Sequence, residues 1–142
     1  MNKNKSGFTL VEVLVVITLI GVLATIAVPA IMSITKKMNE RSFEKKIALI
    51  ESAAEQYGRD NPQIFKPNID VNISQELNIT LSVLVKAKYF VADEKCGTKY
   101  CPDDNIENKS GCVISTVDKS NLNLKIIKLT KTNQSVVAKY IK

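Results

Sequence analysis

Residues 8–34 read FTLVEVLVVITLIGVLATIAVPAIMSI and carry one ionisable side chain, Glu12. At about 1.5 Å per residue, a helix of this length spans ~40 Å, which exceeds the ~30 Å hydrocarbon core of a bilayer. We therefore predict that the segment crosses a membrane. A carboxylate at the bilayer centre costs about 2.5–3.5 kcal/mol, and such a group is usually retained for a function or a partner. Glu12 is therefore the first candidate functional residue.

A short basic leader precedes the apolar segment. Residues 1–7 read MNKNKSG, so Gly7 stands directly before Phe8, and Glu12 is the fifth residue after the glycine. This pattern, with Pro29 further along the segment, resembles the class III signal of type IV prepilins and pseudopilins. The resemblance implies that a prepilin peptidase cleaves after Gly7 and that the new N-terminus at Phe8 is N-methylated. It also implies that Glu12 takes part in subunit assembly.

Two simpler explanations of the N-terminus are a secretory signal peptide, cut near residues 28–30, and a plain uncleaved anchor. Glu12 inside the apolar run, the length of that run and the helical sequence beyond it all oppose a signal peptide. Charge alone would orient the segment the other way, because the basic residues after it outnumber Lys3 and Lys5 of the leader. Those residues are Lys36, Lys37, Arg41, Lys45 and Lys46. We follow the resemblance, which implies a single-pass precursor with its leader in the cytoplasm.

The helix is expected to continue over residues 35–57, which contain good helix formers and no Gly or Pro. Apolar residues recur every three or four positions and mark one packing face: Phe43, Ile47, Ile50, Ala54 and Tyr57. The solvated face carries charged residues: Lys37, Glu40, Arg41, Glu44 and Glu51. Gly58 is the expected C-terminal cap, and Pro62 opposes further helix. The whole helix would be about 50 residues and ~75 Å long.

Gly21 and Pro29 are the expected sites of distortion in the apolar half of the helix. Proline has no N–H to donate to the carbonyl of Thr25, which favours a kink or a local opening. In proteins that the N-terminus resembles, the region between these positions can unwind when subunits pack into a filament.

Residues 58–142 are expected to form one exported globular domain that follows the leader (1–7), the apolar helix (8–34) and its continuation (35–57). Residues 59–79 are rich in Asn, Asp and Pro, which indicates a loop. A short helix is expected next, with Thr80 as N-cap; a strand is the alternative. Its apolar face would hold Leu81, Leu84, Val85 and Tyr89.

Three strands are expected in the last third of the chain, at residues 112–117, 121–130 and 135–141. In the middle strand, Leu122, Leu124 and Ile126 alternate with polar residues, and the alternation is lost at Ile127. Short turns favour an antiparallel sheet that lies against the apolar stripe of the long helix. The predicted fold class is therefore α+β, a long N-terminal helix packed on about three antiparallel strands, as in pilins.

The three cysteines lie in and beside one polar loop, at Cys96, Cys101 and Cys112. An exported domain would oxidise a pair of them and leave one thiol. We predict a Cys101–Cys112 disulfide, with Cys96–Cys112 as the alternative. Zinc held by the cysteines with Asp103 or Asp104 is chemically feasible, but the spacing fits no standard zinc ribbon, so we predict no metal site.

The composition argues against an enzyme. The chain has no histidine, which removes the commonest general base, and it shows no nucleophile motif or phosphate-binding loop. We therefore predict no catalytic residues and no cofactor. The net charge of +6 is too mild to indicate nucleic acid by itself. Residues 119–142 contain six lysines and no acid, which indicates a lysine-guarded sheet edge more than a DNA-binding patch.

The predicted function is that of a structural subunit, a pilin or pseudopilin, of a type IV pilus-like filament. The implied partners are other pilins, the prepilin peptidase and methyltransferase, an inner-membrane assembly platform, and lipids before assembly. The precursor would lie in the cytoplasmic membrane, and the assembled filament at the cell surface. The alternative function is a single-pass, monomeric binding or adhesive protein.

Overall fold

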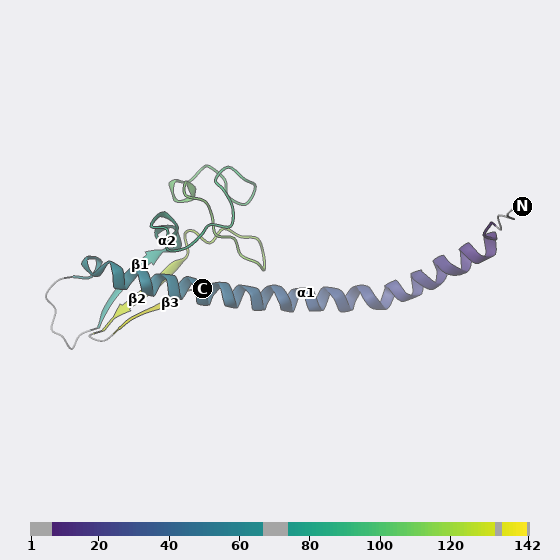
Figure 1. Cartoon of the computed structure of the whole chain (residues 1–142), viewed down its shortest axis with the longest axis horizontal. Coiled ribbons are helices and arrows are strands. Elements are labelled where there is room, and N and C mark those ends of the chain that lie inside the picture. Colours follow the sequence, from purple (N-terminus) through teal and green to yellow (C-terminus); the bar gives the residue numbers. More distant parts are fainter. Residues whose placement is uncertain (1–6, 67–73, 133–134, 142) are drawn as a thin grey trace, which may run out of the picture. The chain divides into compact units, whose positions relative to one another are not determined.

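The computed structural model describes residues 7–66, 74–132 and 135–141 of the chain. Its helices are α1 (Leu10–Asp60) and α2 (Leu81–Lys86), and short 3-10 turns lie at Pro62–Ile64 and Ile106–Asn108. Its strands are β1 (Gln75–Thr80), β2 (Ile126–Lys131) and β3 (Val136–Tyr140), so the fold is α+β as predicted (Figure 1). The chain divides into two compact units, up to Met38 and from Asn39.

The first unit is the apolar part of α1. Every large apolar side chain between Phe8 and Ile34 is exposed, from 49% at Val15 to 88% at Phe8. The threonine hydroxyl groups of this part, at Thr18, Thr25 and Thr35, donate to backbone carbonyls three or four residues earlier. The helix is long and apolar enough to cross a membrane, by length and composition. It runs without a break through Gly21 and Pro29, so a kink there stays a prediction.

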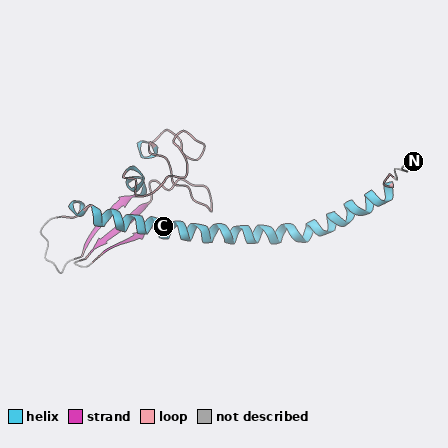
Figure 2. Cartoon of the chain, viewed as in Figure 1, coloured by secondary structure: helices cyan, strands magenta, loops and turns pink. Residues whose placement is uncertain are grey.

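The second unit packs the rest of α1 on a three-stranded antiparallel sheet of order β1-β2-β3 (Figure 2). Leu129 of β2 stands opposite both Leu77 of β1 and Ala138 of β3. The predicted helix face is confirmed: Ile50 and Ala54 are fully buried, and the outer members of the stripe pack against the same core: Phe43, Ile47 and Tyr57. The predicted short helix is confirmed as α2 with Thr80 at its N-cap position, but it ends at Lys86, before Tyr89 of the predicted face.

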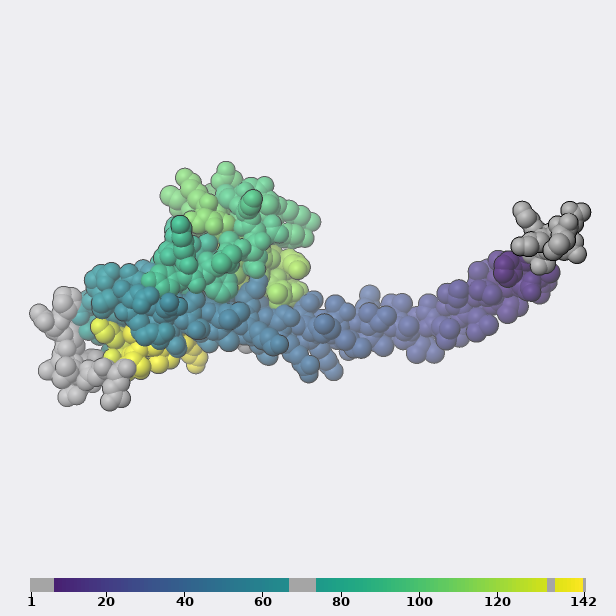
Figure 3. All heavy atoms as spheres, viewed as in Figure 1, coloured from purple at the N-terminus to yellow at the C-terminus, as the bar shows by residue number. Residues whose placement is uncertain are grey.

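The remainder of the second unit is a long irregular region between α2 and β2. Figure 3 shows this region (green) packed along the same part of α1 (teal). Lys46 of α1 donates to Asp93 Oδ2 at 2.7 Å and to Ile114 O at 2.8 Å. Thr116 donates its hydroxyl to Asn39 O at 2.9 Å. Polar contacts from the helix therefore hold the irregular region in place.

Gly58 does not cap the helix as predicted, because α1 continues to Asp60. Gly58 is buried, and a Cβ placed on it would lie 2.7 Å from Cγ1 of Val136 in β3. The residue is therefore glycine for close approach between helix and sheet, not for a left-handed conformation.

We expect Gly58→Val to destabilise the second unit by about 1–3 kcal/mol, because the β-branched Val136 cannot move aside without repacking. Thermal unfolding of the full chain in detergent measures this. The matched control is Ala48→Val, at an exposed position of the same helix. It should lower the stability only by the difference in helix propensity, about 0.5 kcal/mol. Equal melting temperatures for the two variants would contradict the close-packing role.

Two strand predictions need correction. Residues 112–117 form only isolated bridges, Glu94 with Cys112 and Ile114 with Asn121, because disulfide and side-chain contacts take the place of a ladder there. The predicted strand at 121–130 starts only at Ile126, since Lys125 donates to Leu122 O and closes a turn. That turn changes the register, so Ile127 and Leu129 are buried while Leu124 and Ile126 are exposed.

β1 was expected to be loop. Its sequence, QELNIT, pairs residue by residue with β2, from Gln75 opposite Lys131 to Thr80 opposite Ile126. Asn and Glu occur at its outward positions, so its composition alone does not indicate a strand.

Glu51 does not lie on the solvated face as predicted. Its carboxylate accepts the backbone N–H of Tyr140 at 2.9 Å, and Glu55, one turn later, accepts that of Ala138 at 3.3 Å. β3 is an edge strand, and an edge strand with free N–H groups is a template for pairing with other chains. The two helix carboxylates therefore close this edge.

Candidate functional site

The peptide bond between Gly7 and Phe8 lies just before α1, which begins at Leu10. Phe8 is 88% exposed, and a Cβ at Gly7 would meet no atom of the described chain within 4 Å. The bond predicted to be cleaved is therefore in accessible, non-helical backbone. Leader residues 1–6, with Lys3 and Lys5, lie outside the described residues.

Thr9 and Glu12 form a reciprocal cap at the start of α1. The backbone N–H and the hydroxyl of Thr9 both donate to Glu12 Oε2, at 2.9 and 3.0 Å. In return the N–H of Glu12 donates to Thr9 Oγ1 at 3.2 Å. This is a capping box, which satisfies two helix N–H groups that otherwise have no partner.

The capping box fixes the Glu12 side chain and still leaves one carboxylate oxygen free to bind another group. Cleavage before Phe8 would leave Thr9 and its N–H in place, so the mature N-terminus would keep the capping box. Within the described chain, Oε1 of Glu12 receives no hydrogen bond. That oxygen lies at the positive end of the helix dipole and can accept a bond from a cation. The sequence placed Glu12 near the N-terminus, but it did not reveal the role of Thr9, although the spacing of Thr9 and Glu12 fits the capping-box pattern.

The second cluster of predicted residues is the cysteine loop. Cys101 and Cys112 form the disulfide, with Cα atoms 5.5 Å apart and both side chains fully buried. The alternative pairing through Cys96 is therefore wrong. Cys96 is a free thiol that donates to Asp103 Oδ1 at 3.2 Å, and this bond raises the pKa of the thiol. Across the described ranges, no three His, Cys, Asp or Glu residues are placed to hold a metal ion.

Removing the disulfide by Cys101→Ser with Cys112→Ser should lower stability by about 2–4 kcal/mol, because the unfolded chain gains the entropy of an open loop. The measurement is thermal unfolding of the full chain in detergent. Cys96→Ser is the control and should unfold like the unaltered protein.

Thiol reactivity separates the two kinds of cysteine. The unreduced protein should take up one alkyl group, at Cys96, and do so slowly near neutral pH, since the thiolate is the reactive form and the pKa is raised. Asp103→Asn removes the carboxylate that raises the pKa of Cys96 and should speed alkylation of this thiol. Uptake of three alkyl groups without reductant would contradict the disulfide.

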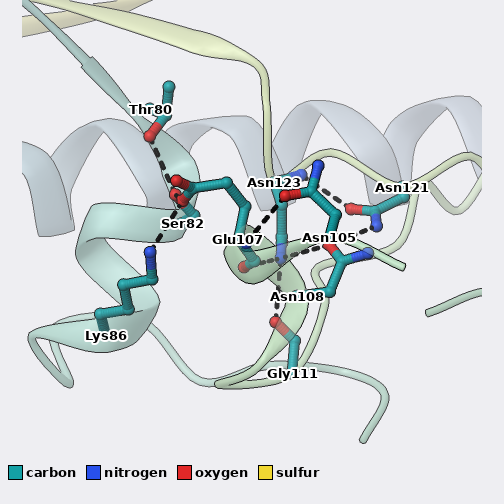
Figure 4. Close-up of polar contacts among 9 residues, drawn as sticks. All are labelled: Thr80, Ser82, Lys86, Asn105, Glu107, Asn108, Gly111, Asn121 and Asn123. Carbon is teal, nitrogen blue, oxygen red and sulfur yellow. Dashed lines mark hydrogen bonds and ion pairs between the residues drawn. The ribbon is translucent and has the colours of Figure 1, made fainter. Parts of the chain in front are cut away.

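A buried asparagine, which sequence reasoning missed, organises the loop behind the disulfide (Figure 4). Asn123 is fully buried; its amide nitrogen donates to Glu107 O at 2.9 Å and to Gly111 O at 3.0 Å. Its carbonyl oxygen accepts the N–H of Val113 at 3.0 Å. One side chain thus satisfies backbone groups from three points of a segment without regular structure, which buried polar groups require.

Glu107 ties the same loop to α2. Its carboxylate accepts hydrogen bonds from Ser82 and from Lys86, the latter at 3.0 Å. These bonds lower the pKa of Glu107, and the bond from Ser82 has the larger effect. The contacts are structural, and they leave the loop rigid.

Two of the lysines near the C-terminus contact other side chains of the chain. Lys128 pairs with Glu76 at 2.7 Å, and Lys131 lies over the ring of Phe65, 5.2 Å from its centre. Lys128 and Lys131 belong to β2, the central strand, so these two lysines do not protect a sheet edge as predicted. They add no support for DNA binding.

Comparison with known proteins agrees with the N-terminal pattern. The family model for the prokaryotic N-terminal methylation motif matches residues 2–28. Type II secretion system core protein G of Klebsiella michiganensis is 33% identical over 91 residues, 64% of this chain and 62% of that protein. The protein of the same name from Aeromonas hydrophila is 39% identical over 59 residues, and the match covers 41% of its length.

A longer match comes from a second kind of relative. A fimbrial protein of Pseudomonas aeruginosa is 28% identical over 138 residues, which cover 92% of this chain and 89% of that protein. No solved structure matches the chain. The methylation motif, the relatives from secretion systems and fimbriae, and the apolar helix continuing onto an antiparallel sheet agree with one another. In its N-terminal motif and its fold, the chain is similar to type IV pilins and pseudopilins.

Proposed function

We propose that the chain is a structural subunit of a type IV pilus-like filament, cleaved after Gly7 and assembled through the first part of α1. The observation that carries the proposal is the exposure of this part: its apolar side chains have no core to pack in, and the one carboxylate among them lies at the helix start. A surface of this kind is not stable in water, since burying each such side chain is worth about 1.5–3 kcal/mol.

Two environments bury this surface, a bilayer and a bundle of identical helices. Lipid chains and packed side chains are similarly apolar, so moving from one to the other changes the hydrophobic free energy little. Packing and charge then decide assembly, and Glu12 is the charged group available. N-methylation of Phe8 would keep the terminal amine positive, and this amine is the cation that we assign to Glu12 of a neighbouring subunit.

The proposal includes the route to the filament. The precursor lies in the cytoplasmic membrane with its leader in the cytoplasm, surrounded by lipids. Prepilin peptidase and methyltransferase act on Gly7 and Phe8, and an inner-membrane platform moves the subunit into a filament at the cell surface. Residues 8–34 form the filament core, and the domain after residue 58 faces outward.

The experiment is mass spectrometry of the cell-associated protein, together with imaging of sheared surface material using an antibody against residues 74–142. We expect a mature N-terminus at Phe8, methylated or free, and labelled filaments. An intact Met1 in a protein confined to the membrane would instead establish the single-pass anchor.

A further inference from the structure

A groove of about 670 Å³ lies beside α1 in the second unit. Ser42, Lys45 and Leu49 of the helix line one side of it, and Phe90 and Val91 line the other. Leu49 is 64% and Val91 84% exposed, so the groove presents apolar side chains to solvent on both walls.

The lining of the groove carries one cation without an ion pair among the described residues, Lys45; Arg41 lies one helical turn before it, and Glu44 is not part of the lining. Lys46 is neutralised by Asp93 at 2.7 Å. Arg41 and Lys45, one helical turn apart and both exposed, have no carboxylate within 4.0 Å in the part of the chain that the structure describes. A partner for this surface should therefore combine an apolar side chain with negative charge.

The same chain carries such an element on the disulfide loop. Residues 102–107, here called the acidic loop, read PDDNIE. Ile106 is 65% exposed, and Asp103 and Asp104 beside it are exposed. Glu107 is already bound to Ser82 and Lys86 (Figure 4), so the free charge of the acidic loop comes from the two aspartates.

The acidic loop is held in one conformation. The Cys101–Cys112 disulfide closes it. Asn108 donates to Pro102 O at 2.9 Å, and the N–H of Glu107 donates to Asn105 Oδ1 at 2.9 Å. Because the loop is already ordered, Ile106 would enter a binding site without the entropy cost of fixing a flexible segment.

We propose that the acidic loop of one subunit docks in the groove of a second copy of this chain, with Ile106 against Leu49 and Val91 and the two aspartates near Arg41 and Lys45. The contact joins two different surfaces of the same molecule. Such a head-to-tail contact does not form a two-fold dimer, and it repeats into a helical filament when the rotation between subunits does not close a ring. The inference rests on the proposed function and adds to it a contact between the outer domains, separate from Glu12.

The test is a charge exchange in full-length protein expressed in cells that assemble it. Arg41→Glu with Lys45→Glu, and separately Asp103→Lys with Asp104→Lys, place like charges across the contact. Like charges across an interface are strongly unfavourable, so each pair should reduce sheared filaments by roughly tenfold or more. All four substitutions together restore opposite charges and should return the yield to within roughly threefold of the unaltered protein. Lys125→Glu with Lys139→Glu, both exposed, is the matched control and should assemble normally.

The outcomes separate this contact from the proposed function. Every variant should still show Phe8 at its N-terminus, since the contact acts after processing. Normal filaments from either reversed pair, or no recovery with all four substitutions, would overturn the docking proposal and leave the filament role standing. Absence of filaments from the unaltered protein would overturn both.

Discussion

Gly7→Val is expected to leave the precursor uncut and held in the membrane. The bond after Gly7 lies in accessible backbone, and Phe8 is exposed. Access to the bond therefore does not limit cleavage. In the proposed processing, the peptidase site has to accept a residue without a side chain before the cut bond. A pocket rejects even one extra methylene by roughly 10- to 200-fold, so the larger valine side chain should slow cleavage at least that much. The measurement is the mass of the cell-associated protein, which shows whether residues 1–7 are still attached.

Gly21→Val is the matched control for this change. It adds the same side chain to another glycine of the first unit, where a Cβ also meets no described atom within 4 Å. Its processing should match that of the unaltered chain. Cleavage of Gly7→Val at the normal rate, followed by normal filaments, would show that Gly7 is not the processing site.

The long helix could be predicted from the sequence because its signals are local. The apolar length of residues 8–34 and the three-to-four spacing from Phe43 to Tyr57 each lie within one segment, and both agree with the structure. The boundary at Gly58 was wrong for the opposite reason. Its requirement for glycine comes from Val136, far along the chain.

The sheet was harder to predict because strands depend on partners that are distant in sequence. β1 has polar outward residues and pairs with a strand some fifty positions later. Leu124 and Ile126 have the right alternation, but the turn at Leu122–Lys125 moves the buried face to Ile127 and Leu129. Asn123 was missed for the same reason. Its side chain binds Glu107 O, Gly111 O, Asn108 Oδ1 and the N–H of Val113, but in the sequence it looks like any loop asparagine.

The residues of the candidate site could be predicted from the sequence, but their geometry could not. Gly7, Phe8 and Glu12 stand in a fixed local pattern, and the structure adds the geometry that the pattern lacks, with Thr9 capped by the carboxylate. The edge of β3 shows the reverse case. Glu51 and Glu55 have the spacing of a solvated helix face, and only the position of β3 reveals that they bind its N–H groups.

Glu12→Leu is expected to be made, inserted and cleaved after Gly7, and yet to be absent from filaments. The carboxylate lies about 6 Å along the helix axis from the mature N-terminus. In the proposed filament core, pairing with the methylated amine of a neighbouring Phe8 would offset part of the cost of burying both charges. Removing one partner strands the other, at a cost of roughly 3–5 kcal/mol. For a simple anchor the expectation reverses, since a membrane helix without its carboxylate should insert better.

The capping box allows a sharper control than leucine alone. Glu12→Gln keeps an oxygen that can accept the bonds from Thr9, and glutamine serves at this position of a capping box, but the charge is lost. If the charge sets the register between subunits, the glutamine variant should also be cleaved and stay out of sheared filaments. Filaments from Glu12→Gln but not from Glu12→Leu would assign the residue to the helix cap instead. Normal filaments from Glu12→Leu would remove the assembly role altogether, because that variant loses both the charge and the side-chain bonds to Thr9.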